Sequence, residues 1–237
     1  MIKIKVAGLT VGLDNRYSYV ERLAADYTVD DDAEVDFTVS ATDEEIAAER
    51  EAGEAEFTDG YLESIVLYRN IAERLPLYSA AVFHGAVIAI DGKAYAVTAR
   101  SGVGKTTHLR IWQRVFGERV HILNGDKPIL RIIDGKVHAA GTPWRGKESY
   151  GVNEMLPLCG IAFIDRGEEN SAEPLSASAA LIPFITQLYV PKGERCARLA
   201  LALSSSIISS VPLVRLRANM QDDAALVAYR ALVGEDN

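Results

Sequence analysis

The sequence predicts an α/β fold: a mixed sheet with antiparallel hairpins, preceded by a small α+β lobe. Apolar runs typical of strands are joined at Asp91-Gly92 and again at Asp134-Gly135, and Asp-Gly between such runs is a strong signal for a tight β-hairpin. Strand-like and helix-like segments are also mixed along the later part of the chain. We expect the lobe over residues 1–78 and the core over residues 79–237.

The N-terminal lobe begins with a strand. Apolar residues alternate with other residues over positions 2–6, which is the period of a half-buried strand, and residues 34–41 predict a second strand. Residues 30–56 carry twelve carboxylates and a single arginine, and we interpret this run as a solvated helix face. Thr42 and Glu45 are spaced as a capping box, so they predict where that helix starts.

A second helix is expected from residue 60 to residue 75. Apolar residues recur there at spacings of four, three, four and three, which predicts one buried stripe. The stripe consists of Tyr61, Ile65, Tyr68, Ala72 and Leu75. Pro76 is expected to end the helix.

The core contains the two hairpins and a further set of strands and helices. We expect a buried strand at 157–165, helices at 176–190 and 193–207, a strand at 211–218 and a closing helix at 222–233.

Residues 99–107 read "ARSGVGKTT" and resemble a phosphate-binding loop, or Walker A motif. They follow an apolar strand-like run and precede a segment with helical periodicity, which is the context that the motif requires. Ala99 stands where the strict pattern has glycine, a small cost if its φ is negative. The alternative is a glycine-rich turn with a surface lysine. The residues predicted to hold phosphate are Ser101, Gly102, Val103, Gly104, Lys105, Thr106 and Thr107.

Each residue type in this loop has a physical role. Gly102 and Gly104 let backbone N–H groups turn toward phosphate oxygens, and the start of the helix adds partial positive charge. Lys105 is predicted to bridge phosphate oxygens, and the Thr106 hydroxyl is predicted to ligate Mg²⁺. Asp126 follows another apolar run, twenty residues beyond Thr106, and is the candidate for a second Mg²⁺ ligand. The alternative for Asp126 is an ordinary turn residue.

Residues 83–130 resemble the catalytic core of the bacterial HPr serine kinase/phosphorylase family, which shares a nucleotide-binding core with phosphoenolpyruvate carboxykinase. The resemblance rests on His84-Gly85, on "SGVGKT" and on Asp126. Residues 141–167, "GTPWRGKESYGVNEMLPLCGIAFIDRG", look closer to the small HPr-kinase-related proteins. The resemblance implies a carboxykinase-type P-loop core, binding of ATP or another nucleoside triphosphate with Mg²⁺, and self-association. It also implies phosphoryl transfer to a hydroxyl of a protein, a peptide or a small molecule.

One residue departs from these relatives. They typically read Asn-Asp-Asp-Lys-Pro where this chain has Asn124-Gly125-Asp126-Lys127-Pro128. Two carboxylates divide metal binding from general-base catalysis, and Gly125 removes one of them. Either Asp126 keeps the metal while another residue is the base, or the chain is a nucleotide-binding regulatory or scaffold protein with weak or lost phosphotransfer.

Three further residues are catalytic candidates. His84 is the candidate substitute base, because the family geometry brings its strand near the loop and an imidazole accepts protons near neutral pH. Arg145 and Lys147 are candidates to stabilise charge on the transferred phosphoryl group or to hold an acidic substrate. The alternatives are a buried structural histidine and an exposed basic loop over Trp144. We interpret the other three histidines, His108, His121 and His138, as structural.

Composition excludes several partner classes. With a net charge of −8, the chain has no basic field to gather nucleic acid, and no apolar run approaches the roughly 18 residues of a membrane span. Cys159 and Cys196 lie far apart and suggest reduced thiols. We therefore expect a cytoplasmic protein with no membrane partner.

Overall fold

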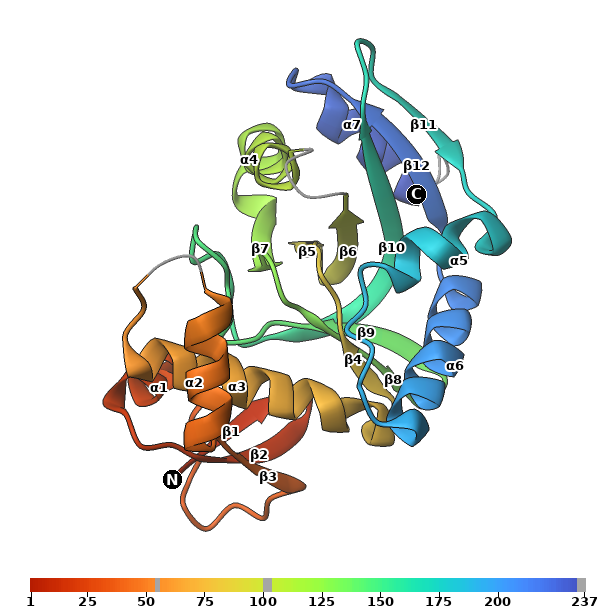
Figure 1. Ribbon diagram of the computed structural model, residues 1–237. Helices are drawn as coiled ribbons and strands as arrows, with labels where there is room; N and C mark the ends of the chain where they lie inside the picture. The colour runs from red at the N-terminus through yellow and green to blue at the C-terminus, as the bar shows by residue number, and fades with distance from the viewer. Residues whose placement is uncertain (54–55, 100–103, 234–237) are drawn as a thin grey trace.

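Two β-sheets organise the chain in the computed structural model, which describes residues 1–53, 56–99 and 104–233 (Figure 1). The N-terminal lobe holds a three-stranded sheet. The core holds a curled, mixed sheet of nine strands. The α/β class with antiparallel hairpins is therefore confirmed.

The lobe is built from three strands and three helices. They are β1 (Ile2–Val6), β2 (Leu9–Asp14), α1 (Ser18–Leu23), β3 (Phe37–Ser40), α2 (Asp43–Ala52) and α3 (Asp59–Arg74). Strand β2 was not predicted: it pairs with β1 through a tight turn at Ala7-Gly8, where both residues have positive φ, 51° and 72°. The predicted capping box of α2 is confirmed, since Thr42 and Glu45 bond each other's backbone N–H groups.

The predicted buried stripe of helix α3 is confirmed only in part. The fully buried apolar residues of the helix are Leu62, Val66, Leu67 and Ile71, together with Ala72. Of the predicted stripe, Ala72 and Leu75 are buried as expected. Tyr61, Ile65 and Tyr68 are only partly buried, because they also line a cavity. The helix ends at Arg74, and a short 3-10 turn (Leu75–Tyr78) carries Pro76.

The core follows with nine strands and four helices. They are β4 (Ala80–Val82), β5 (Ala86–Ile90), β6 (Lys93–Thr98), α4 (Lys105–Phe116), β7 (Val120–Asn124), β8 (Ile129–Ile133), β9 (Lys136–Ala140), β10 (Met155–Arg166), β11 (Ser171–Pro174), α5 (Ala177–Ile185), α6 (Glu194–Ser210), β12 (Leu213–Ala218) and α7 (Asp223–Val233). Both predicted Asp-Gly hairpins are confirmed, β5–β6 at Asp91-Gly92 and β8–β9 at Asp134-Gly135. Short β4 and β11 were not predicted.

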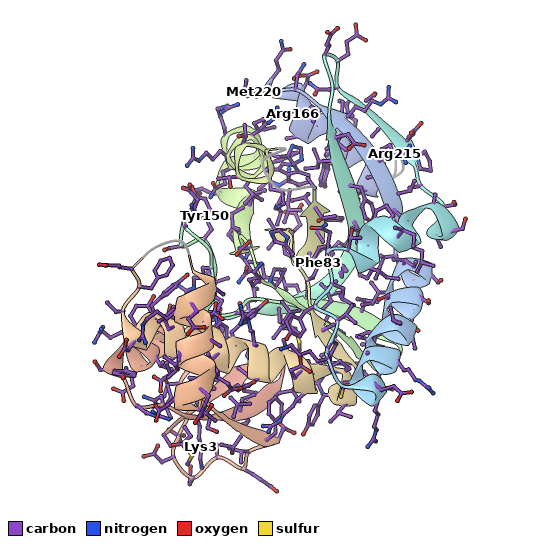
Figure 2. The ribbon with its side chains drawn as sticks, viewed as in Figure 1. Lys3, Phe83, Tyr150, Arg166, Arg215 and Met220 are labelled. Atoms are coloured by element: carbon purple, nitrogen blue, oxygen red, sulfur yellow. The ribbon has the colours of Figure 1, made fainter. Side chains whose placement is uncertain are left out.

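Helices cover both faces of the core sheet (Figure 1). In β6, Ala94 and Ala96 face a cluster that includes α5 and α6, whereas Tyr95 and Val97 face a cluster that includes α4 and α7. Figure 2 shows Phe83 in the interior, where its ring stacks on Phe184 of α5 with centroids 5.3 Å apart. Because helices cover both faces of the sheet, the sequences of its central strands are continuous apolar runs.

Residues of the lobe and of the core pack together in one hydrophobic cluster. The cluster that contains the lobe strands and α3 continues into Ala80, Val82, Ile129, Ala140 and Trp144. The division of the chain at residue 78 stays a prediction. No helix in the described part of the chain is long and apolar enough to cross a membrane.

A buried carboxylate fixes α1 against α3, and this contact gives the first prediction. Glu63 is fully buried and its two oxygens accept the backbone N–H groups of Arg16 and Tyr17, at 2.7 and 3.1 Å, just before α1. Glu63→Gln turns an amide donor toward one of these N–H groups. We expect it to lower the free energy of unfolding in urea by about 1–3 kcal/mol. Glu51→Gln, at an exposed position of α2, is the matched control. Equal stability of the Glu63 variant and wild type would contradict this role.

Candidate functional site

The pairing of β5, β6 and β7 brings distant residues to one edge of the sheet. Strand β5 is antiparallel to both neighbours, with Ala86 opposite Val97 and Val87 opposite Asn124. The start of β5 therefore lies beside the ends of β6 and β7. His84, the residues leading to α4, and Asp126 consequently meet at this edge.

A cavity of about 660 Å³, which we call the interlobe cavity, opens at this edge. Its walls come from α1 and α3 of the lobe and from the core. Six of the predicted site residues line it: His84, Lys105, Thr106, Asp126, Arg145 and Lys147. Gly104 and Thr107 line a different pocket, and Ser101, Gly102 and Val103 lie outside the described residues.

The start of α4 is electrostatically suited to an anion. Gly104 has a φ of 127°, a conformation that L side chains rarely adopt. Within the described residues, no side chain caps this end and its first turn contains no acidic residue. It contains Lys105 instead, although the helix dipole disfavours a cation there. An anion bound at the helix start would accept hydrogen bonds from the first-turn N–H groups, which have no partner within the helix, and from the lysine.

Lys105 is half-buried and points back toward the end of β6. Its Nζ donates to the carbonyl oxygen of Ala99 at 3.3 Å. Burial lowers the pKa of Lys105, the nearby Asp126 carboxylate raises it, and Lys127 lowers it; the net shift is downward. Ala99 is buried and does not have a positive φ, so the position accepts alanine in place of glycine.

Asp126 places an ionised carboxylate in the interlobe cavity. Its Oδ1 lies 3.5 Å from Nε2 of His84, and its Oδ2 lies 3.7 Å from Nζ of Lys127. Burial acts to raise the pKa of Asp126, but His84, Lys127 and Lys105 together bring it below its ordinary value. The carboxylate is therefore anionic at neutral pH.

Asn124 holds the loop that carries Asp126. Its side chain is fully buried, and its Oδ1 accepts the backbone N–H groups of Asp126 and Lys127 at 2.9 and 2.7 Å. Its Nδ2 donates to Thr142 and to the carbonyl oxygen of Trp144. The sequence analysis gave Asn124 no role, although its place two residues before Asp126 is typical of an Asx turn.

Two glycines shape the space around Asp126. A Cβ on Gly146, whose φ is +73°, would lie 2.8 Å from Cβ of Asp126, so only glycine allows this close approach. A Cβ on Gly125 would lie 3.3 Å from Cβ of Tyr150 and 3.4 Å from the carbonyl oxygen of Arg145. An aspartate at position 125 therefore fits only if Tyr150 or the Arg145 loop moves by a few tenths of an ångström.

The two basic candidates differ in their surroundings. Arg145 lines the cavity, but its guanidinium donates to Asp26 of the lobe at 2.6 Å and lies over the ring of Tyr27. Arg145 thus ties the core to the lobe. Lys147 is exposed at the rim, and neighbouring Glu148 pairs with Arg110 of α4 at 2.8 Å.

Three tyrosines of the lobe and Trp144 of the core form an aromatic wall that was not predicted from the sequence. Tyr19, Tyr61, Tyr68 and Trp144 line the cavity opposite the core edge. The rings of Tyr68 and Trp144 lie 5.3 Å apart, and the Trp144 indole N–H donates to the carbonyl oxygen of Ser64 in α3. Burial, and then the nearby Asp126 charge, raise the pKa of Tyr68, so its phenol stays neutral. Figure 2 shows Tyr150 between the lobe and α4.

The donor set fits Mg²⁺ bound together with phosphate. Magnesium in proteins usually takes one or two carboxylates and completes its coordination with water and substrate phosphates. Asp126 and the Thr106 hydroxyl line one cavity with room for such ligands. The described residues contain no group of three or more His, Cys, Asp and Glu side chains that could hold a metal, so Mg²⁺ here would depend on a bound phosphate.

Comparisons with known proteins add little. No family model matches the chain, and no curated protein matches it. Among solved structures, the chain is similar to the HPr(Ser) kinase/phosphatase from Coxiella burnetii, with a TM-score of 0.36 and 12% identity; the match covers 64% of this chain and 87% of that chain. A similarity of this size carries no argument about activity, so function is argued from the cavity residues.

The charges around Asp126 predict its response to pH. Because its pKa lies below the ordinary 3.8 in the folded chain, ionised Asp126 stabilises the fold above that pH, and this contribution is lost as the pH falls through the folded pKa. Lys127→Met removes one neighbouring cation and is expected to raise the pKa of Asp126. Carbon-13 NMR titration of the Asp126 carboxyl measures the shift, with exposed Lys136→Met as control. A wild-type pKa at or above 3.8 would refute the assignment.

Proposed function

We propose that the chain binds a nucleoside triphosphate with Mg²⁺ and transfers its terminal phosphoryl group to a hydroxyl. The observation that carries this proposal is the meeting of Lys105, Thr106, Asp126 and His84 in one cavity at the start of α4. A cation, a hydroxyl, a carboxylate and an imidazole are the groups that phosphoryl transfer uses. The predicted phosphate contacts of Ser101, Gly102, Val103 and Thr107 belong to the same proposal.

The chain's residues divide the chemistry as follows. The start of α4 and Lys105 hold the triphosphate, and bound Mg²⁺, held by Thr106 and Asp126, would neutralise charge on the phosphate oxygens. The acceptor oxygen attacks the terminal phosphorus, the bond to the nucleoside diphosphate breaks, and His84 takes the hydroxyl proton. Asp126, 3.5 Å from His84, stabilises the imidazolium that forms. Lys147 at the rim and Arg145 attract an anionic acceptor or the transferred group.

A second candidate is a nucleotide-binding regulatory protein with weak or lost phosphotransfer. Among the described residues that line the cavity, the carboxylates are Asp126 and Glu148, and Glu148 is paired with Arg110. Asp126 would therefore have to ligate the metal and also stabilise protonated His84. Because one carboxylate would serve both roles, phosphoryl transfer would be slow or absent.

Nucleotide binding is tested by calorimetry. We expect wild type to bind MgATP with a Kd below the millimolar range. Lys105→Met should weaken binding by about 10- to 100-fold, because it removes a charge-assisted contact to phosphate. Lys93→Met, at the opposite end of β6, is the matched control and should bind as wild type does. Absence of wild-type binding at millimolar MgATP would overturn the proposal.

Turnover separates the two candidate functions. Gly125→Asp restores a second carboxylate, and Gly125→Asn has the same size without the charge. If the chain is a kinase, wild type hydrolyses or transfers the ATP phosphate and His84→Ala lowers the rate by about 10²- to 10⁴-fold. If it is regulatory, wild type shows no turnover, Gly125→Asp gains it, and Gly125→Asn does not.

A further inference from the structure

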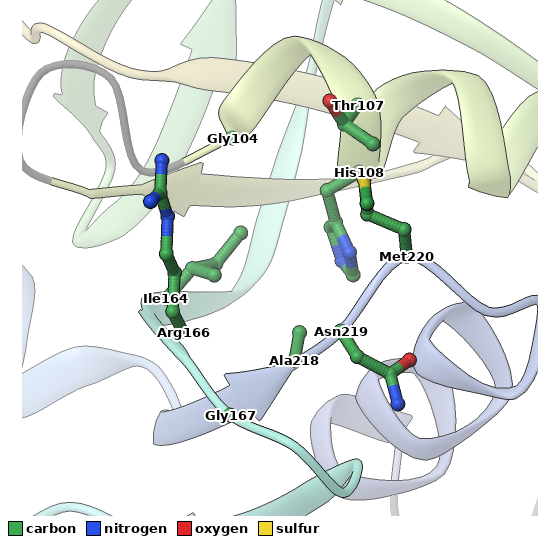
Figure 3. Close-up of a pocket in the computed structure, with 9 residues that line it drawn as sticks. All are labelled: Gly104, Thr107, His108, Ile164, Arg166, Gly167, Ala218, Asn219 and Met220. Carbon is green, nitrogen blue, oxygen red and sulfur yellow. The ribbon is translucent and has the colours of Figure 1, made fainter.

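A second hollow, which we call the α4 pocket, lies beside the start of α4 and has a volume of about 470 Å³ (Figure 3). It is lined by Gly104, Thr107 and His108 at the start of α4, and by residues at the ends of β10 and β12. It shares no lining residue with the interlobe cavity. The ends of parallel strands β6, β10 and β12 gather here, and ligands of α/β sheets bind at such ends.

Within the described residues, the α4 pocket contains a hydrogen-bond donor that has no partner. His108 is 3% exposed, and its Nε2 accepts the indole N–H of Trp112 at 2.9 Å. Burial lowers the pKa of His108 to about 4, so the ring is neutral at pH 7. A neutral imidazole with an accepting Nε2 carries its proton on Nδ1. Nδ1 is buried and has no hydrogen-bond partner within the described residues.

The unpaired donor distinguishes this pocket from ordinary packing. A buried N–H without a partner costs about 1–3 kcal/mol, and native proteins rarely leave one unpaired unless a ligand or water takes it. Figure 3 shows the His108 ring directed into the hollow, toward Ala218 and Asn219. The side chain of Asn219 is already bonded to Asn170 and to backbone groups, so it is not the partner.

The rest of the wall suits a flat, largely apolar group. Ile164, Ala218 and Met220 provide apolar surface. Thr107 provides a hydroxyl next to the helix start, and Arg166 adds a charged side chain to the wall. Pockets for small ligands commonly have several hundred ångström cubed and combine apolar walls with a few placed polar groups. A nucleoside meets this description, because its rings are flat and their edges carry acceptor nitrogens.

The orientation of a bound nucleotide follows from Thr106 and Thr107, two consecutive residues of α4 that line different cavities. Successive side chains on a helix are about 100° apart, and Thr106 faces the interlobe cavity while Thr107 faces the α4 pocket. A triphosphate at the helix start, with its terminal phosphate toward Asp126, therefore directs its other end toward the α4 pocket. A third hollow beside α5 contains no residue of α4, so the same argument does not reach it.

We propose that the α4 pocket holds the nucleoside portion of the nucleotide, with the base against Ile164 and Ala218 and an acceptor atom of the nucleoside bonded to Nδ1–H of His108. This inference rests on the proposed function, since it requires a triphosphate at the start of α4. It assigns His108 to ligand binding, where the sequence analysis interpreted it as structural.

The test compares MgATP with magnesium tripolyphosphate, which has the phosphates but no nucleoside. We expect wild type to bind MgATP about tenfold more tightly or better, which is the value of one buried hydrogen bond with ring packing. Ala218→Trp fills the pocket and should bring the MgATP affinity down to that of tripolyphosphate, while tripolyphosphate binds as to wild type. Ala202→Trp, on the exposed face of α6, is the matched control and should keep the preference for MgATP.

A direct readout comes from the histidine itself. Nitrogen-15 NMR of His108 should show Nδ1 shifting when MgATP is added and staying in place when tripolyphosphate is added. Equal wild-type affinities, or a preference for MgATP that survives Ala218→Trp, would overturn the pocket assignment while leaving triphosphate binding intact. If neither compound binds, the proposed function fails, and this inference fails with it.

Discussion

The buried amide of Asn124 fixes the geometry on which the candidate site depends. Its oxygen accepts two backbone N–H groups of the Asp126 loop, and its nitrogen donates to the Thr142–Trp144 segment, so one side chain sets the position of two loops. Neither loop has regular secondary structure of its own, and an unpaired buried amide is costly. The carboxylate of Asp126 and the aromatic wall at Trp144 are thus held at a fixed distance from each other. This kind of rigidity is what positions a reacting group without motion at the moment of reaction.

The charges at the start of α4 and at Asp126 determine which kind of ligand this edge of the sheet can bind. Within the described residues, the start of α4 has no side-chain cap and carries a lysine, whereas Asp126 supplies an ionised carboxylate in the same cavity. Three buried polar atoms that lack a hydrogen-bond partner within the described residues belong to hollows around this edge: His108 Nδ1, Arg145 Nε and Gln187 Oε1. Unpaired polar atoms elsewhere in a protein are rare, so their concentration here is consistent with a surface built for a polar ligand.

Much of the fold could be predicted from local signals in the sequence. Asp-Gly turns at residues 91 and 134 and the capping box at Thr42 are encoded by neighbouring residues, and each is confirmed. The turn at Ala7-Gly8 was missed because alanine rarely adopts positive φ. The buried stripe of α3 was predicted only in part: Ala72 and Leu75 are buried, but periodicity cannot distinguish a core stripe from a cavity wall, and Tyr61 and Tyr68 contribute to both. The sequence predicts a structural His108, because the surroundings of its Nδ1 depend on Trp112 and on strand ends over fifty residues away; its role in ligand binding is our proposal.

Most of the aromatic wall and the edge that carries Asp126 come from different parts of the chain. Tyr19 and Tyr61 stand on helices of the lobe, whereas Lys105 stands on α4 and His84 and Asp126 stand beside core strands. Under the proposed function, changes in α1 and α3 would alter the shape of the space offered to an acceptor, while the groups proposed to bind phosphate stay on the core. A lineage of such chains could then diversify its acceptors by substitutions in the first seventy-odd residues, and an engineer could do the same.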